Sequence, residues 1–214
     1  MAALEVDRYE PAGFDDGSDQ WCDTILVAAK GLGRFGEEFG RRRAEWSDIV
    51  DHLPRLYSAA SRRPGGRVIE LGIRTGNSTA ALLAGAAAVG GHVWSVDREP
   101  PTVPDWWSSS PTWTCVLGDD VAVADQLPDD VDVVFLDTSH EYKATLRELS
   151  AYLPKVRSGG VLLCHDTEVE HPEGVPEGPP FPVRRAIEDV VAGTQLHCEY
   201  VAGCYGLGVI HVAA

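Results

Sequence analysis

The sequence predicts an α/β protein with a doubly wound, mostly parallel seven-stranded sheet, a C-terminal antiparallel hairpin and N-terminal helices. Two observations predict this class. From residue 67 onward, short continuous apolar runs alternate with helical segments, and such runs are typical of parallel strands buried on both faces. An acidic residue also closes each of the first five runs, although Asp and Glu are depleted within strands.

The predicted elements follow one another in a regular order. Residues 1–20 form a polar arm, and 21–60 are expected to be helical, with Pro54 kinking or splitting the last helix. Residues 196–212 contain two strands joined by a turn near Gly203. The strands before them are expected at 67–72, 92–97, 112–119, 131–137 and 158–166, with helices at 77–89, 141–156 and 181–193.

This order divides the chain at a break rich in Arg, Pro and Gly. Residues 1–62 are the N-terminal arm and helices, and residues 63–214 are the α/β domain. The helices are expected either to cover the ligand end of the sheet or to mediate a homodimer, and the sequence does not choose between the two.

Composition excludes several classes of protein. The chain has 18 Lys and Arg and 33 Asp and Glu, which gives a net charge of −15. This charge argues against a nucleic-acid partner, because proteins that bind nucleic acids contact the phosphates with basic residues. The five cysteines form no CxxC pair, and we expect them to be reduced thiols. No apolar run approaches the roughly 20 residues of a membrane span, so we expect a cytoplasmic protein without a membrane partner.

The stretch ELGIRTGNST, residues 70–79, contains the turn between the first strand and its helix. Its Gly72 and Gly76 lack the G-x-G-x-x-G spacing of a dinucleotide loop, and no Lys completes a phosphate loop. The pattern suits a ligand with an amino-acid end and a nucleoside but no phosphate. Glu70 could accept from an ammonium group, and Asn77 and Ser78 could donate to a carboxylate; a tight turn without a ligand is the alternative.

The next two strand-end acids extend this prediction to the nucleoside. Asp97 could accept hydrogen bonds from two ribose hydroxyls, with a simple helix cap as the alternative. Asp119 could accept from the adenine amino group. In open sheets of this kind, ligands bind beyond the carboxyl ends of the strands.

These residues carry a resemblance to a known family. The stretch 67–166 resembles the class I S-adenosylmethionine-dependent methyltransferases, with ELGIRTGNS similar to their first motif and SVD to their second. The block DTSHEYKATLRELSAYLPKVRSGGVLLCHDT resembles a narrower group, the small-molecule O-methyltransferases that include macrolide-sugar methyltransferases and relatives of cephalosporin hydroxylase. The resemblance implies a Rossmann-like fold, S-adenosylmethionine as cofactor, and 63–214 as the domain that binds it.

A metal site is predicted where the fourth and fifth strands end. Asp137 and Asp166 close strands that are expected to be neighbours, and two carboxylates there can share one hard cation. In the resembling family such acids bind a divalent metal that positions two neighbouring hydroxyls. Mg²⁺ is expected, with Mn²⁺ as an alternative.

Two histidines adjoin these acids. His140 is the candidate catalytic base, as the resemblance also implies, with a surface or capping histidine as the alternative. His165 stands where many relatives carry an acid. It is either a third metal ligand, which would favour a transition metal, or it points into the sheet, because neighbours on a strand alternate faces.

The sequence thus predicts a metal-dependent O-methyltransferase acting on a hydroxyl of a sugar or glycosylated metabolite. One alternative is a catechol-type enzyme with a phenolic substrate, for which Trp106 and Trp107 could wall an apolar slot. Another is a non-catalytic protein that binds a nucleoside cofactor. The expected partner is a small hydroxyl acceptor.

Overall fold

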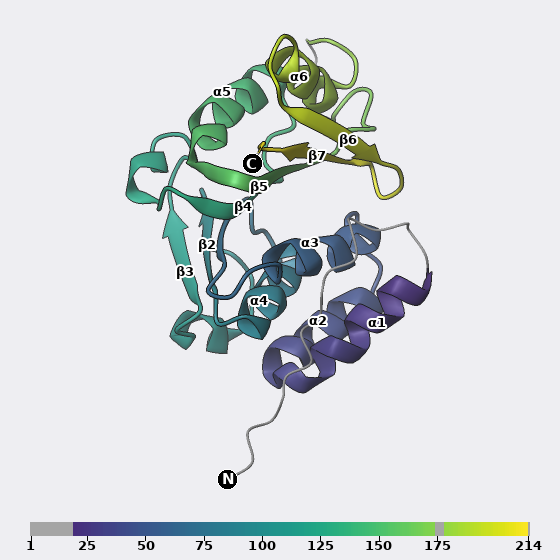
Figure 1. The fold of residues 1–214 in the computed structure, drawn as a ribbon, viewed down its shortest axis with the longest axis vertical. Coiled ribbons are helices and arrows are strands. Elements are labelled where there is room, and N and C mark those ends of the chain that lie inside the picture. Colours follow the sequence, from purple (N-terminus) through teal and green to yellow (C-terminus); the bar gives the residue numbers. More distant parts are fainter. Residues whose placement is uncertain (1–18, 174–177, 214) are drawn as a thin grey trace.

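The structure is a computed structural model that describes residues 19–173 and 178–213, with side chains from residue 24 onward. Most of the polar arm predicted for residues 1–20 therefore lies outside the described residues. Seven strands form one sheet in the order β3-β2-β1-β4-β5-β7-β6 (Figure 1). They are β1 (Arg67–Leu71), β2 (His92–Asp97), β3 (Trp113–Leu117), β4 (Val131–Leu136), β5 (Val156–His165), β6 (His197–Val201) and β7 (Leu207–His211).

The predicted sheet is confirmed. Strands β1 to β5 pair in parallel, and β7 pairs antiparallel with both β5 and β6. The switch point of the strand order lies between β1 and β4, so the carboxyl ends of these strands border the place where such sheets bind ligands.

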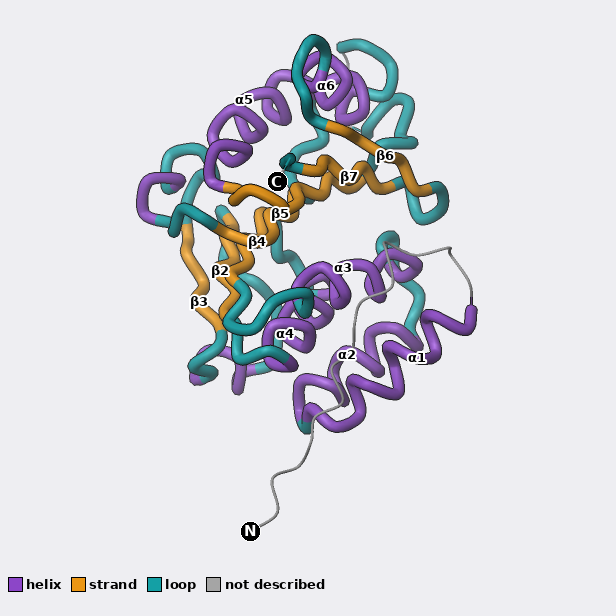
Figure 2. Tube along the Cα trace, in the orientation of Figure 1, coloured by secondary structure: helices purple, strands orange, loops and turns teal. Residues whose placement is uncertain are grey.

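Helices cover both faces of the sheet (Figure 2). The N-terminal helices and α4 lie on one side, and α5 and α6 lie on the other (Figure 1). The α-helices are α1 (Asp19–Ala29), α2 (Arg34–Ala44), α3 (Leu53–Ala60), α4 (Asn77–Ala88), α5 (Tyr142–Tyr152) and α6 (Pro182–Val191). The 3-10 helices are η1 (Lys30–Leu32), η2 (Val50–His52), η3 (Asp105–Ser109), η4 (Ala124–Gln126) and η5 (Leu153–Lys155).

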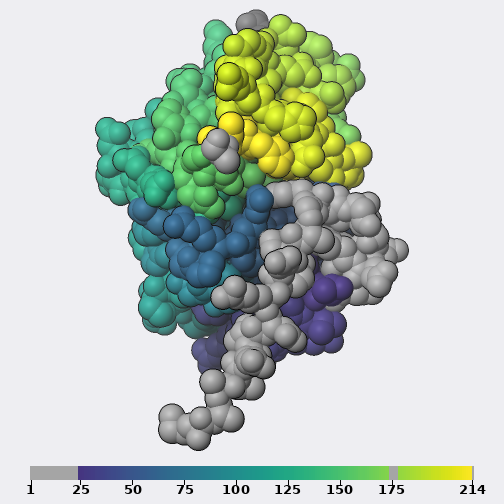
Figure 3. Space-filling model, in the orientation of Figure 1, coloured from purple at the N-terminus to yellow at the C-terminus, as the bar shows by residue number. Residues whose placement is uncertain are grey.

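Each face of the sheet packs its own hydrophobic core. In β4, Val133 and Phe135 belong to the core under α1–α4, whereas Val134 and Leu136 belong to the core under α5 and α6. This alternation follows from the two-residue period of a strand. In Figure 3 the green to yellow atoms of the C-terminal half form the upper part of the molecule, and purple atoms of the N-terminal helices lie in its lower part.

The helical stretch predicted for 21–60 is divided into α1, α2 and α3 with 3-10 turns between them. Pro54 stands in the first turn of α3, where its missing N–H would have no intrahelical partner. These helices share the core of α4 and the sheet. No helix of the described residues is long and apolar enough to cross a bilayer.

Candidate functional site

The glycine loop after β1 depends on close backbone packing. Gly72 has φ 91°, and a Cβ there would lie 1.9 Å from the carbonyl oxygen of Asp137. Gly76 has φ 78°, and its Cβ would lie 2.7 Å from the ring of Trp107. Both positions therefore require glycine for space as well as for the left-handed backbone. Gly72 holds the loop directly against the chain that leaves β4.

Glu70 lies inside the molecule, within β1. Its carboxylate accepts hydrogen bonds from Ser78 Oγ at 2.7 Å, Thr79 Oγ1 at 3.0 Å and Ser95 Oγ at 2.5 Å. Burial raises the pKa of Glu70 to about 7, although the three hydroxyls act to lower it. Glu70 and Ser78 thus bind each other, and the structure does not bring either side chain to the ligand positions predicted for them.

Asp97 ends β2 and fixes the glycine loop. Its Oδ2 accepts from the backbone N–H groups of Ile73 at 2.9 Å and Arg74 at 3.0 Å, and its Oδ1 accepts from Glu99 N at 3.1 Å. Burial raises the pKa of Asp97, but the backbone donors outweigh burial and leave the pKa below its usual value. The carboxylate is therefore ionised and joins the loop to the end of the neighbouring strand.

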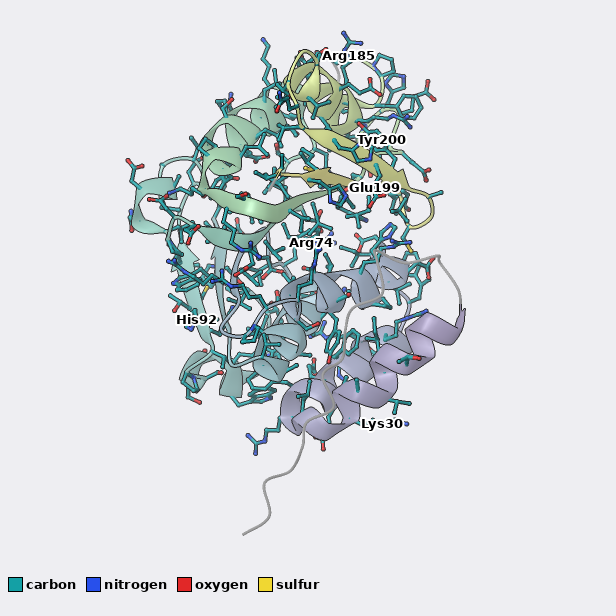
Figure 4. All side chains as sticks on the ribbon, in the orientation of Figure 1. Lys30, Arg74, His92, Arg185, Glu199 and Tyr200 are labelled. Carbon is teal, nitrogen blue, oxygen red and sulfur yellow. The ribbon has the colours of Figure 1, made fainter. Side chains whose placement is uncertain are left out.

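A cavity of about 230 Å³ opens at the carboxyl ends of β1, β2 and β4. Arg74, from the glycine loop, lies near the middle of the molecule between the sheet and α3 (Figure 4). The cavity is lined by Gly72, Arg74, Val96, Asp97, Arg98, Gly118, Asp120, Asp137, Thr138, Ser139 and Glu148. Of the predicted site residues, Gly72, Asp97 and Asp137 line it.

The acid that reaches the cavity after β3 is Asp120, not the predicted Asp119. Asp119 is half exposed, binds Arg98 Nη2 at 2.7 Å and caps Ala122 N at 3.1 Å. Asp120 is 9% exposed. Because β3 ends at Leu117, strand alternation no longer decides which of two consecutive acids turns inward.

Asn77 is also placed differently from the prediction. Its Oδ1 accepts from Arg42 Nη1 at 2.8 Å, so its amide connects the start of α4 to α2. Like Gly76, it is absent from the cavity lining. The first turn of α4 is therefore held by the N-terminal helices.

Sequence reasoning missed Glu148, a buried acid on α5 that lines the cavity. Its Oε1 accepts from Thr138 Oγ1 at 2.6 Å, in the loop that also carries Asp137. Burial raises the pKa of Glu148 to about 7, and a hydrogen bond with the Asp120 carboxyl raises it further. Its position beside the buried Leu149 was the available signal, because an acid on the apolar face of a helix needs a partner.

The acids after β4 and β5 meet two imidazoles. His140 Nε2 lies 3.2 Å from Asp137 Oδ1 and 2.8 Å from Asp166 Oδ2. His165 Nδ1 lies 3.5 Å and 3.1 Å from the same two oxygens. The ligand atoms of Asp137, His140 and Asp166 all lie within 4.8 Å of one another. We call these four residues the acid–imidazole cluster.

Charges within the cluster compensate one another. Burial lowers the pKa values of both histidines, but the two carboxylates outweigh it and raise the pKa to about 9 for His140 and about 11 for His165. Conversely, burial raises the pKa values of Asp137 and Asp166, yet the imidazoles leave both below the usual range. A cation that binds here takes the place of the imidazole protons.

His165 is oriented toward the cluster. Its Nε2 lies 2.7 Å from the carbonyl oxygen of Cys204, and since a carbonyl only accepts, Nε2 carries a hydrogen and donates it. Nδ1 is thereby left facing Asp137 and Asp166. The donor set of two carboxylates and two imidazoles fits a divalent metal, and the imidazoles favour a transition metal over Mg²⁺.

The structure thus favours one of the two orientations that the sequence left open for His165. Although the side chain is almost fully buried, its Nδ1 faces the acids rather than the sheet core. His140 has φ 56°, a left-handed backbone that is uncommon outside glycine. Such outliers cluster at functional sites.

Comparisons with known proteins agree with the fold. Residues 69–167 match the family described as "Methyltransferase domain". The SAH-bound methyltransferase PaMTH1 of Podospora anserina gives a TM-score of 0.64 at 12% identity and covers 92% of this chain and 97% of its own. The O-methyltransferase of Bacillus cereus in complex with SAH gives 0.56 at 16% identity and 91% of both chains.

A third solved structure is MycE, a methyltransferase of the mycinamycin biosynthetic pathway in complex with Mg, SAH and mycinamycin VI. Its TM-score is 0.58 at 15% identity, covering 77% of this chain and 50% of the MycE chain. No curated protein sequence matches this chain. At these identities the solved structures establish the fold, and the family match covers the glycine loop and both acids of the predicted metal site. Residues 69–167 are therefore similar to a methyltransferase domain, and the chain has the fold of the SAH-bound methyltransferases.

Proposed function

We propose that this chain is a metal-dependent O-methyltransferase that acts on a hydroxyl of a sugar or glycosylated metabolite. One observation carries the proposal. Asp137 lines the cavity at the end of the sheet and also belongs to the acid–imidazole cluster with His140 and Asp166. A hydroxyl held at the cluster would therefore lie beside a methyl donor in the cavity.

The cavity residues suit the nucleoside end of S-adenosylmethionine. Asp97 is ionised and faces the cavity, so it can accept from ribose hydroxyls. Asp120 takes the role predicted for Asp119, because its carboxyl lines the cavity and can accept from an adenine amino group. Gly72 leaves the loop without a side chain where it faces the cavity.

The cluster residues suit a divalent metal and a proton acceptor. Asp137, Asp166 and His165 would hold the metal, which when bound lowers the pKa of an acceptor hydroxyl. His140 Nε2 would receive the hydroxyl proton, because it lies beside both carboxylates and a bound cation would take the place of the proton that they hold on the imidazole. His140 is less buried than His165, with a side chain 30% exposed against 1%.

The acceptor class rests on resemblance. Residues 137–167 resemble the small-molecule sugar methyltransferases, and the fold is similar to that of MycE, whose structure contains Mg and mycinamycin VI. The slot that a phenolic acceptor would need is not formed by Trp106 and Trp107. Trp107 is buried against Gly76 and Trp113, and Trp106 packs on Phe35.

Calorimetry tests both parts of the proposed site, the cofactor cavity and the metal site at the acid–imidazole cluster. S-Adenosylhomocysteine titrated into chelator-treated protein should give a binding heat, and Mn²⁺ or Mg²⁺ should give a separate heat that Asp137→Ala abolishes. Asp119→Ala is the matched control, since this acid lies at the same end of the sheet but outside cavity and cluster. A metal heat that survives Asp137→Ala would contradict the assignment.

An acceptor screen tests the chemistry. Turnover with S-adenosylmethionine should be measured on sugars, glycosylated metabolites and catechols, with and without chelator. Methylation confined to catechols would contradict the proposal that the acceptor is a sugar. Turnover that a chelator does not change would contradict the proposed metal dependence. A parent protein that binds the cofactor tightly but methylates none of them would favour the non-catalytic alternative.

Other expectations from the sequence stay predictions. These are the homodimer, the division of the chain at residues 62 and 63, and the cytoplasmic location. Light scattering of the purified chain would decide the oligomeric state.

A further inference from the structure

The hairpin turn between β6 and β7, residues 203–206, has a strained backbone. Gly203, Cys204, Tyr205 and Gly206 have φ values of 93°, 43°, 65° and 82°. Glycine adopts such values without cost, but Cys204 and Tyr205 do not, and each such residue costs on the order of 1–3 kcal/mol. A turn of this kind persists only where its surroundings hold it, so the contacts of the turn indicate what it is for.

Every carbonyl of the turn accepts a hydrogen bond. The donors from outside the turn come from two directions, the N-terminal segment before α3 and the chain that leaves β5. These bonds are His52 Nε2 to Gly203 O at 2.8 Å, His165 Nε2 to Cys204 O at 2.7 Å, Glu168 N to Tyr205 O at 2.7 Å and Thr167 N to Gly206 O at 3.4 Å. Within the turn, Gly206 N also donates to Gly203 O at 2.8 Å. The turn therefore bridges His52 and the metal-site histidine.

His52 is buried, and its hydrogen bond to Gly203 O ties it to the turn. It lies in η2, is 1% exposed, and its ring meets that of His165 edge to face with centroids 5.9 Å apart. Its Nδ1 has no hydrogen-bond partner among the described residues, so the bond to Gly203 is the one that its ring makes there. The preceding Asp51 accepts from Cys204 Sγ at 3.2 Å and adds a second contact with the turn.

We propose that the 203–206 turn, held by His52, is a positioning element that fixes the His165 ring with Nδ1 toward Asp137 and Asp166. A fixed carbonyl that accepts from Nε2 decides which ring nitrogen faces the acids and removes rotation about the ring axis. His52 belongs neither to the cavity lining nor to the acid–imidazole cluster, so it is a positioning residue. Through it the N-terminal segment becomes part of the site. The proposal rests on the metal role assigned to His165 above.

A matched pair of variants isolates the His52 bond. The amide nitrogen of glutamine lies close to the place of Nε2, so His52→Gln keeps a donor for Gly203 O. Asparagine is shorter and its amide does not reach this carbonyl, although it is equally neutral and polar. Because outer partners of a metal ligand change affinity by about 10–100-fold, His52→Asn should bind Mn²⁺ at least about 10-fold more weakly.

Mn²⁺ affinity is measured by electron paramagnetic resonance of free Mn²⁺. His52→Gln should remain close to the parent, and both variants should keep the parent affinity for S-adenosylhomocysteine, since His52 does not line the cavity. Thermal unfolding verifies that both variants are folded. Parent-like Mn²⁺ affinity in His52→Asn would overturn the proposal.

A second readout does not depend on the metal. In nitrogen-15 NMR of the metal-free protein, the His165 Nε2–H should exchange slowly with water in the parent and His52→Gln, and rapidly in His52→Asn. Equal protection in all three would overturn the role of His52. If the parent binds no Mn²⁺ at all, the metal in the proposed function fails, and the NMR result alone decides whether His52 fixes the ring.

Discussion

Gly72 is the residue at which the glycine loop and the acid–imidazole cluster touch. Its missing side chain lets the loop lie against the backbone of Asp137, which both lines the cavity and belongs to the cluster. One backbone contact thus sets the distance between the proposed cofactor and metal positions. A misplacement of about 1 Å at such a junction can cost 10²-fold in rate.

Gly72→Ala should lower the free energy of unfolding by more than the positive φ of residue 72 alone would cause. Gly90 is the matched control, because its φ is 66° but a Cβ there meets nothing within 4 Å. Gly90→Ala should cost about 1–2 kcal/mol of unfolding free energy, and Gly72→Ala at least about 3 kcal/mol from strain and overpacking together. Urea unfolding measures both, and equal losses would show that the contact with Asp137 carries no energy.

At the scale of an element, α5 joins the two halves of the site through Glu148. The helix buries this acid against Thr138 of the cluster loop and Asp120 of the cavity wall. Two carboxyls in contact at a buried site favour a shared proton, because two adjacent negative charges repel each other. The neutral form of Glu148 can accept from Thr138 and donate to Asp120.

Glutamine mimics this neutral form, so Glu148→Gln should lose less than about 1 kcal/mol of stability. Glu148→Ala removes both hydrogen bonds and should lose about 2–3 kcal/mol. Its affinity for S-adenosylhomocysteine should also fall, because Asp120 and Thr138 lose their support. Urea unfolding and calorimetry check this; a Gln variant as damaged as the Ala variant would mean that Glu148 acts as an anion.

At the scale of the whole molecule, pH should act on stability through Glu70. Its folded-state pKa of about 7 lies above the ordinary value of 4.5, so the folded protein binds this proton more tightly than the unfolded chain. The stabilisation is fully present below pH 4.5 and is lost as the pH rises to 7. Over that window Glu70 should remove about 3 kcal/mol of unfolding free energy.

Glu70→Gln isolates this contribution, because glutamine cannot ionise and can still accept from the hydroxyls around it. The difference in unfolding free energy between parent and variant should shift in favour of the variant as the pH rises from 4.5 to 7. Urea unfolding at several pH values gives this difference. A constant difference across the window would show that Glu70 keeps an ordinary pKa in the folded protein.

The whole molecule also brings five distant segments to one edge of the sheet. The glycine loop, the chains leaving β4 and β5, the β6–β7 turn and the N-terminal η2 all meet around Asp137 and His165. The cavity and the cluster are built on ends of strands buried on both faces, a rigid base for side chains that must keep their distances.

The sequence alone determined the order of the elements, the parallel sheet and the acids at its carboxyl end. The apolar character of a run and the strand period are local properties, so a run such as VVFLD predicts both its strand and the place of Asp137. For the same reason the glycine loop, Asp97, His140 and Asp166 could be singled out before any contact was known. These signals predict a ligand with an amino-acid end and a nucleoside, and the resemblance that they carry implies S-adenosylmethionine.

Only the tertiary structure decided which side chains turn into the site. Asp120 rather than Asp119 faces the cavity, Glu70 and Ser78 bind each other, and His165 turns Nδ1 to the acids. His52 and the 203–206 turn reach His165 from opposite ends of the chain. Such outcomes depend on how distant segments pack and on where each polar atom finds its partner, and no local pattern of residues encodes either.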